Sequence, residues 1–216
     1  MKKAIIFDVD GVLIDSNKVI IKAYKKTAKK LGLRIPSSEE IIDLLGKPLE
    51  EIAVTFWPNV DLELYIKEHR KLFIDKILHI PRIKGALDAV KKLKKAGFKL
   101  GVVSGGCMFL VKRHLKDAGF DIKWFETISS FEATKKHKPD PEPLFYVMDK
   151  LNMEPEETLY VGDAVPDYEC AKNAKVEYVA VLTGCLNREK LEKLGVKNII
   201  SSVAELPKFL RLETVS

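Results

Sequence analysis

Short apolar segments alternate along this chain of 216 residues with stretches whose apolar side chains recur every three or four positions. That alternation is typical of an α/β fold, in which helices cover both faces of a parallel sheet. The segment at residues 4–7 is apolar throughout, as expected for a strand buried on both faces. Gly97 and Gly119 each follow a helical stripe, where they suit helix C-caps. The same reasoning predicts further strands at residues 99–103, 124–128, 158–161, 178–182 and 198–200.

The region at residues 16–80 breaks this alternation, because it contains helical patterns and no convincing strand. Three apolar stripes at helical spacing lie in it, and the last one extends to Ile77. Helices placed between the first strand and the rest of a sheet predict an inserted all-α domain. We therefore expect an α/β core formed by residues 1–15 and 82–216, and a helical domain formed by residues 16–81.

The composition is ordinary for a soluble globular protein, with 46% hydrophobic and 31% charged residues. No apolar run approaches the roughly 18 residues that a membrane span needs. The apolar start is interrupted at Asp8, which is too early for a signal peptide. The three cysteines are far apart and suit free thiols rather than a zinc site or a disulfide framework. We therefore expect a cytoplasmic protein, either a monomer or a homodimer.

The net charge of +6 concentrates in lysine clusters at residues 22–30 and 91–95. Basic clusters can attract nucleic acid or membrane surfaces. Aromatic residues are not interleaved with these lysines, however, so no platform for stacking bases is evident. We interpret the clusters as solvated helix faces, and we expect neither nucleic acid nor a membrane as a partner.

Two carboxylates, Asp8 and Asp10, follow the first predicted strand and precede Gly11. Residues two apart in an extended segment point to the same side, so both side chains can converge just beyond the strand. Open α/β sheets bind ligands at that edge. Two carboxylates this close repel each other unless a cation lies nearby, and Mg²⁺ is the simplest oxygen-preferring candidate.

The second predicted strand ends in Ser104, Gly105 and Gly106. A hydroxyl, nearby N–H groups and the start of a helix can together hold the oxygens of a phosphate. Taken alone, this segment is better explained as a plain strand-to-helix turn that uses glycine for its conformational freedom.

A third polar segment runs from His137 to Pro143 and contains Lys138. Its three prolines stiffen the loop and are expected to keep it extended. A lysine on a rigid loop can act as a fixed cation beside a phosphate. We expect Lys135 and Lys136 to face solvent instead, and His137 to be structural.

The fourth segment follows the strand predicted at 158–161 and contains Gly162, Asp163 and Asp167. Gly162 permits close backbone approach. Asp163 lies at a strand end, so it can reach the same cation as Asp8. Four predicted strand ends thus bring carboxylates, a hydroxyl and a lysine to one edge of the sheet.

In this order, the four segments resemble the motifs of the haloacid dehalogenase-like hydrolase superfamily. The resemblance covers essentially the whole chain and implies a Rossmann-like parallel sheet core with an inserted all-α cap domain. It implies that Asp8 is a nucleophile that becomes an aspartyl-phosphate, and that Asp10 is the general acid and base. One departure is Lys175, where members of the family commonly have glycine.

The resemblance also implies the remaining roles at the site. Ser104, Gly105 and Lys138 are expected to bind the phosphate group. Mg²⁺ is expected to be held by Asp8, the backbone carbonyl of Val9, and Asp163. In a supporting role, Asp167 is expected to orient metal-bound water or to pair with Lys138.

The implied activity is that of an Mg²⁺-dependent phosphatase acting on a small phosphorylated metabolite, either a phosphoglycolate-like compound or a sugar phosphate. Dehalogenating and phosphonate-cleaving relatives lack the second aspartate of the first motif, so Asp10 favours phosphate-ester chemistry. A mutase resembling β-phosphoglucomutase is the alternative. A non-catalytic binding protein is a more distant one, because Asp8, Asp10, Lys138 and Asp163 are all intact.

Overall fold

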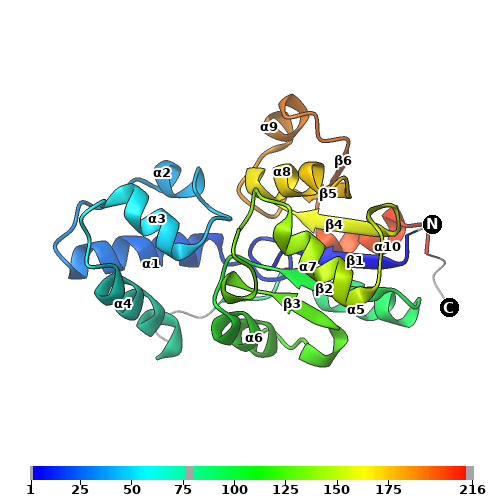
Figure 1. Cartoon of the computed structure of the whole chain (residues 1–216), viewed down its shortest axis with the longest axis horizontal. Coiled ribbons are helices and arrows are strands. Elements are labelled where there is room, and N and C mark those ends of the chain that lie inside the picture. Colours follow the sequence, from blue (N-terminus) through cyan, green and yellow to red (C-terminus); the bar gives the residue numbers. More distant parts are fainter. Residues whose placement is uncertain (1, 76–79, 213–216) are drawn as a thin grey trace.

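The structure is a computed structural model that describes residues 2–75 and 80–212. Its centre is a sheet of six parallel strands in the order β3-β2-β1-β4-β5-β6 (Figure 1). The strands are β1 (Ala4–Phe7), β2 (Lys99–Val103), β3 (Thr127–Ser129), β4 (Thr158–Gly162), β5 (Glu177–Val181) and β6 (Asn198–Ile200). The predicted α/β fold with a Rossmann-like sheet is therefore confirmed.

One predicted strand was displaced. The segment expected at 124–128 begins its strand only at Thr127, because Ile122–Trp124 forms a 3₁₀ turn. The side chain of Asp121 starts that turn by accepting a hydrogen bond of 3.0 Å from the N–H of Lys123. A local cap thus overrides the apolar pattern at this point.

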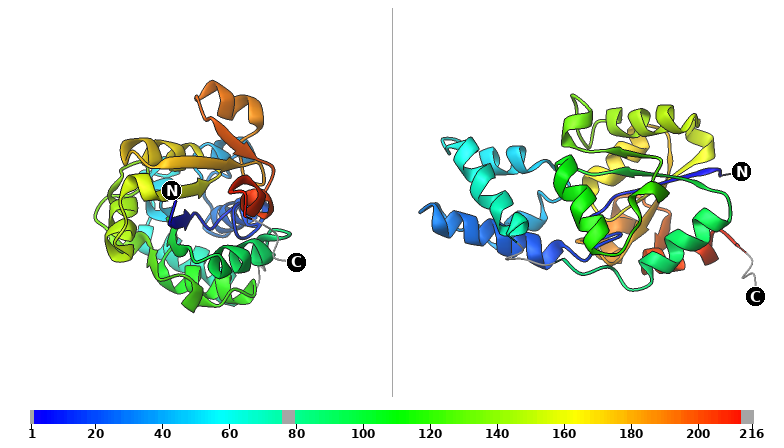
Figure 2. Two further views of the ribbon diagram at one scale, coloured as in Figure 1. Left: turned by 90° about the vertical axis from the view of Figure 1, so that its right-hand side faces the viewer. Right: turned by 90° about the horizontal axis from the view of Figure 1, so that it is seen from below.

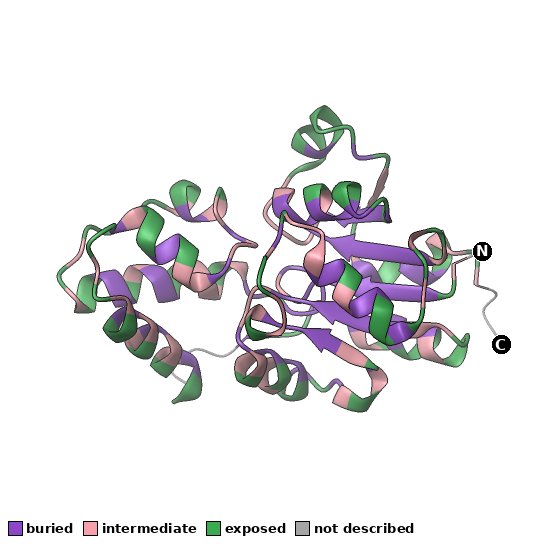
Figure 3. Cartoon of the chain, in the orientation of Figure 1, coloured by how far each residue is buried: buried purple, intermediate pink, exposed green. Residues whose placement is uncertain are grey.

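Helices cover both faces of the sheet. One face carries α5 (Ala86–Lys95), α6 (Met108–Asp117) and α10 (Leu206–Phe209), and the other carries α7 (Glu142–Leu151), α8 (Val165–Asn173) and α9 (Arg188–Lys193). Within β1, Ile5 and Phe7 belong to the first apolar cluster, whereas Ala4 and Ile6 belong to the second. The purple strands of Figure 3 show this burial, which explains why β1 is apolar at every position.

The helices α1 (Asn17–Lys30), α2 (Ser38–Ile42), α3 (Leu49–Phe56) and α4 (Leu62–Ile74), here called the helical unit, lie beyond the carboxyl ends of the strands (Figures 1 and 2). They enclose an apolar cluster of their own, which includes Ile52, Trp57 and Tyr65. Ile77, which the last helical stripe was expected to reach, lies outside the described residues.

The two chain segments that join the helical unit to the sheet run side by side. Ile14 pairs with Arg82 in an antiparallel bridge, and the N–H of Asp15 donates to the carbonyl of Pro81 at 2.8 Å. Within the described residues, no helix combines the length and the apolar character needed to cross a bilayer.

Candidate active site

The site forms where the strand order changes direction. β1 pairs with β2 on one side and with β4 on the other. The helix that follows β2, α6, covers one face of the sheet, and the helix that follows β4, α8, covers the other. A crevice therefore opens between them at the carboxyl ends of the strands. Asp8 directly follows β1, and its N–H extends the ladder by donating to the carbonyl of Val161 at 2.8 Å. Asp163 directly follows β4. Two neighbouring strands thus deliver one carboxylate each.

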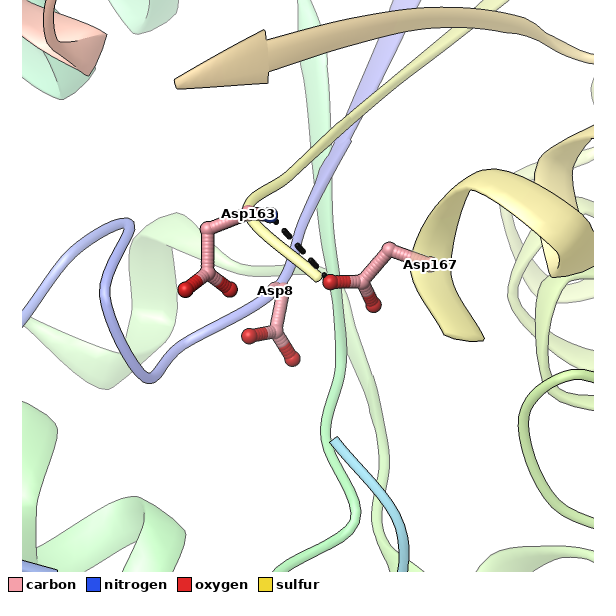
Figure 4. Close-up of side chains that lie close together, drawn as sticks. All are labelled: Asp8, Asp163 and Asp167. Carbon is pink, nitrogen blue, oxygen red and sulfur yellow. Dashed lines mark hydrogen bonds between the residues drawn. The ribbon is translucent and has the colours of Figure 1, made fainter. Parts of the chain in front are cut away.

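These two residues and Asp167, from the first turn of α8, form a carboxylate cluster (Figure 4). One oxygen from each of the three side chains lies within 4.8 Å of the others. All three are buried, with exposed fractions of 4% for Asp8, 4% for Asp163 and 0% for Asp167. Strand ends predict that Asp8 and Asp163 converge, and the family resemblance implies that Asp167 supports them.

Lys138 lies inside the same cluster. Its Nζ donates to Oδ1 of Asp8 at 2.8 Å and to Oδ1 of Asp167 at 2.7 Å. The lysine loop turns instead of staying extended as its prolines predicted, because the N–H of Asp140 bonds the carbonyl of His137 at 2.8 Å. The side-chain amide of Asn173, in α8, also donates to the loop at the carbonyl of Pro139.

Asp167 is saturated with protein donors. Besides Lys138, its Oδ1 accepts from the hydroxyl of Tyr160 at 2.7 Å. Its Oδ2 accepts from the N–H groups of Asp163 and Ala164 at 3.2 and 3.1 Å. Asp167 therefore suits a role in holding Lys138 and the β4–α8 turn, and it has little capacity left for a cation.

Asp8 and Asp163 each keep one oxygen available. Lys138 occupies Oδ1 of Asp8, and the N–H of Cys185 donates to Oδ2 of Asp163 at 3.2 Å. Among the described residues, no hydrogen bond reaches the other oxygen of either carboxylate. The two free oxygens suit a shared cation.

The charge balance of the cluster points the same way. With all three buried carboxylates ionised, the cluster and its one buried ammonium group would carry two net negative charges. Burial is the main cause that raises the pKa of Asp8, to about 8, although Lys138 opposes it. Burial, and then the charge of Asp167, raise the pKa of Asp163. Burial alone would lower the pKa of Lys138, but Asp167 and Asp8 more than offset that effect and raise it. A divalent cation with oxygen ligands fits this donor set.

The backbone carbonyl of Val9 does not suit the ligand role predicted for it. It accepts hydrogen bonds from the N–H groups of Leu13 and Ile14 at 2.9 and 3.1 Å. The carbonyl of Asp10 accepts none from the described residues. The carbonyl of Asp10 belongs to the peptide unit that links Asp10 to Gly11. Gly11 lies so close to Asp163 that a Cβ on Gly11 would overlap the carboxylate of Asp163.

A cleft of about 140 Å³ lies between these strand ends and the helical unit. Asp10 lines this cleft beside Asp8, and Gly105 and Gly106 line its wall. Ser104 is displaced from it: its Oγ accepts from the N–H of Gly106 at 3.1 Å and lines a small adjoining cavity together with Lys138. The charged residues of the cleft are Asp8, Asp10, Lys47, Glu50, Arg70, Lys138 and Asp163.

Three of these charged residues come from the helical unit, and the sequence did not identify Glu50 or Arg70. They form an ion pair of 2.9 Å between α3 and α4. Lys47 lies in the loop before α3, and the carbonyl oxygens of Gly46 and Lys47 are each 3.3 Å from where a Cβ on Gly105 would be. No sequence motif marks these residues, because their approach depends on how the helices pack.

Comparison with known proteins decides the family. Residues 5–181 match the family described as haloacid dehalogenase-like hydrolase. The chain belongs to this family. The resemblance carried by the four motifs is thus confirmed, and the predicted enzyme class, a phosphatase of this hydrolase family, agrees with the relatives below.

A protein of Clostridium perfringens named pyrophosphatase PpaX is 38% identical over 201 residues, which are 92% of this chain and 91% of that protein. A haloacid dehalogenase-like hydrolase of Bacteroides fragilis has a similar structure, with a TM-score of 0.85 and 28% identity over 95% of this chain and all (100%) of that one. CbbY of Rhodobacter sphaeroides, solved in complex with phosphate, has a TM-score of 0.80 and 21% identity, covering 95% of this chain and 96% of that one. At that identity the likeness shows the fold alone.

Proposed function

We propose that this protein is an Mg²⁺-dependent phosphatase that forms an aspartyl-phosphate on Asp8. One observation carries the proposal. Asp8 is a buried carboxylate that is fixed by Lys138, keeps one free oxygen, and lies beside Asp163 at the floor of a cleft. A fixed, desolvated carboxylate with an adjacent cation is arranged for nucleophilic attack on phosphorus.

The residues divide the reaction between them. The Asp8 carboxylate attacks phosphorus, and Lys138, which donates to its Oδ1, neutralises charge on the phosphate oxygens. Asp10, which lines the cleft and is not ion-paired with any described residue, donates a proton to the leaving oxygen. It then takes a proton from the water that hydrolyses the aspartyl-phosphate. Gly105 lines the cleft, and we assign its N–H to a phosphate oxygen, whereas the N–H of Gly106 is already bonded to Oγ of Ser104.

For the metal, we propose Asp8 and Asp163 as carboxylate ligands and the carbonyl of Asp10, in place of that of Val9, as the backbone ligand. The free oxygens described above support this choice. When bound, Mg²⁺ supplies positive charge between the nucleophile and the phosphate. Asp167 acts through Lys138, to which it is bonded at 2.7 Å.

We propose that residues 16–81 form a cap domain over a core of residues 1–15 and 82–216. The separate apolar cluster of the helical unit supports this division. The paired connections at Ile14 and Arg82 also support it, because they form a narrow double hinge between the two parts. A cap that closes over the cleft would exclude water from the phosphate.

For the substrate, we propose a small phosphate compound that carries a second anionic group, such as pyrophosphate or phosphoglycolate. Lys47 and Arg70 support this class, since together they outnumber Glu50, the partner of Arg70, and leave one net positive charge at the end of the cleft that the helical unit provides. The name of the Clostridium perfringens relative is consistent with pyrophosphate. A cytoplasmic location suits the three cysteines, which are all free thiols.

The test is phosphate release from pyrophosphate, phosphoglycolate, a hexose phosphate and p-nitrophenyl phosphate, with Mg²⁺ and with EDTA. We expect metal-dependent turnover, fastest for a substrate with a second anionic group. Absence of release from every substrate, together with phosphate transfer between the carbons of a hexose phosphate, would favour the mutase alternative. Turnover that is equal with Mg²⁺ and with EDTA would contradict the metal-dependent mechanism.

A further inference from the structure

Three consecutive residues after β5 contact the site, although no motif includes them. The hydroxyl of Thr183 donates to the carbonyl of Gly11 at 2.6 Å. The N–H of Cys185 donates to Oδ2 of Asp163 at 3.2 Å. Gly184 lies between them, and its Cα would be 3.1 Å from a Cβ on Gly11. This segment, residues 183–185, therefore touches both the turn after Asp10 and Asp163.

Gly184 leaves no room for a side chain. A Cβ at this position would overlap Oδ2, Cβ and Cγ of Asp163. The backbone of Gly184 thus packs directly against the carboxylate. A close approach of this kind restricts the carboxylate to one orientation, in which Oδ2 meets the N–H of Cys185 and Oδ1 stays free.

The segment is itself held from the opposite side. The side chain of Cys185 packs against the apolar cluster of the helical unit, and Leu186 packs against the cluster that includes Leu191 of α9. Contacts in two directions fix the segment, so it can act as a rigid support for the groups it touches.

We propose that residues 183–185 position Asp163 and the Asp10–Gly11 peptide for binding the divalent cation. Thr183 fixes the carbonyl of Gly11 and so orients the neighbouring carbonyl of Asp10. Cys185 and Gly184 fix the carboxylate of Asp163. These are positioning residues, since they act through the ligands, and the inference rests on the proposed metal site.

The test is direct titration of Mg²⁺ into metal-free protein by calorimetry, in wild type, Thr183→Val, Thr183→Ser and Gly184→Ala. We expect Thr183→Val and Gly184→Ala to weaken Mg²⁺ binding about tenfold or more, as loss of groups that orient metal ligands does elsewhere. Thr183→Ser keeps the hydroxyl and should restore the wild-type affinity. The Mg²⁺ concentration for half-maximal turnover should shift in parallel.

Thr158→Val is the matched control, because it also removes a threonine hydroxyl that donates to a backbone carbonyl in a partly buried hydrogen bond, here to Glu154 at 2.9 Å. It should leave Mg²⁺ affinity unchanged, whatever it does to the melting temperature. Wild-type Mg²⁺ affinity in folded Thr183→Val would overturn the inference even if Gly184→Ala failed to fold. Absence of Mg²⁺ binding by the wild type would instead overturn the proposed metal site.

Discussion

At the residue scale, Lys138 is the side chain on which the carboxylate cluster most depends. Replacing it with methionine would leave Asp8 and Asp167 buried without their cation, which we expect to cost about 3–5 kcal/mol in metal-free protein. Urea unfolding with EDTA measures this. Lys136→Met is the control: its side chain is 70% exposed and its ion pair with Asp140 should contribute less than about 1 kcal/mol. Equal losses in both variants would contradict the account.

His69 of α4 makes stability depend on pH. Burial, and then the charge of Arg70, lower the pKa of its imidazole from 6.5 to about 3. The unfolded chain therefore binds a proton below about pH 6.5 that the folded protein refuses until about pH 3. Stability from this residue is present above pH 6.5 and is lost as the pH falls, by roughly 1.4 kcal/mol per pH unit.

His69→Phe removes that titration while keeping an aromatic ring against Tyr65 and Phe73. We expect wild type to lose about 1–2 kcal/mol more than the variant between pH 7 and pH 5.5, as measured by urea unfolding at both pH values. Identical losses in the two proteins would show that His69 is not buried in its neutral form.

Residues at strand ends could be predicted from the sequence, whereas residues brought in by packing could not. Asp8 and Asp163 directly follow apolar segments, so the parallel sheet alone brings them to one edge, whereas Lys138 reaches them from the loop between β3 and α7. Arg70 reaches the cleft only through the packing of α3 and α4, and Thr183 only through the path of a loop. The family resemblance implies the Val9 carbonyl as a ligand, but the hydrogen bonds of the following turn, which already use that carbonyl, cannot be read from a motif.

At the element scale, several helices, α5, α6 and α8 among them, end in the same hydrogen-bonded motif, although the residue at its left-handed position differs. After α5 and α6, Gly97 and Gly119 adopt a φ of +88°. After α8, Lys175 occupies the equivalent position with a φ of +58°. There the N–H of Val176 bonds the carbonyl of Ala171 at 2.9 Å, as in a Schellman motif. The departure from glycine noted in the sequence is thus a strained position.

Lys175→Gly should relieve that strain and raise the free energy of unfolding by about 1 kcal/mol. Glu169→Gly, at an exposed position in the interior of the same helix, should lower it by about 1 kcal/mol. Thermal unfolding of the two variants shows whether each substitution raises or lowers the free energy of unfolding. A destabilised Lys175→Gly protein would contradict the described helix end.

Helices and strands could be predicted well where the apolar pattern extends over many residues or where every residue of a strand is buried. Positions of β1, β2 and β6 agree with the prediction, and the ends of β4 and β5 differ by one residue. β3 was misplaced because it is short and follows a turn that Asp121 stabilises locally. Short strands give a pattern too brief to outweigh such local hydrogen bonds.

At the scale of the whole molecule, the cleft joins catalytic groups from the sheet to charges from the helical unit. Arg70→Gln should raise KM for pyrophosphate about tenfold or more while changing KM for p-nitrophenyl phosphate much less, because only pyrophosphate presents a second anionic group. Lys71→Gln, an exposed neighbour on α4, is the control. An equal rise for both substrates would contradict the proposed substrate class.

The most direct measurement of the central claim is Mg²⁺-dependent turnover by Asp8→Asn. Asparagine keeps the shape of the side chain and can still accept the hydrogen bond from Lys138, but it is a poor nucleophile. The account predicts that turnover of every substrate falls to the uncatalysed background while the variant stays folded. Turnover by pure Asp8→Asn protein within about tenfold of wild type would contradict the assignment of Asp8 as the nucleophile.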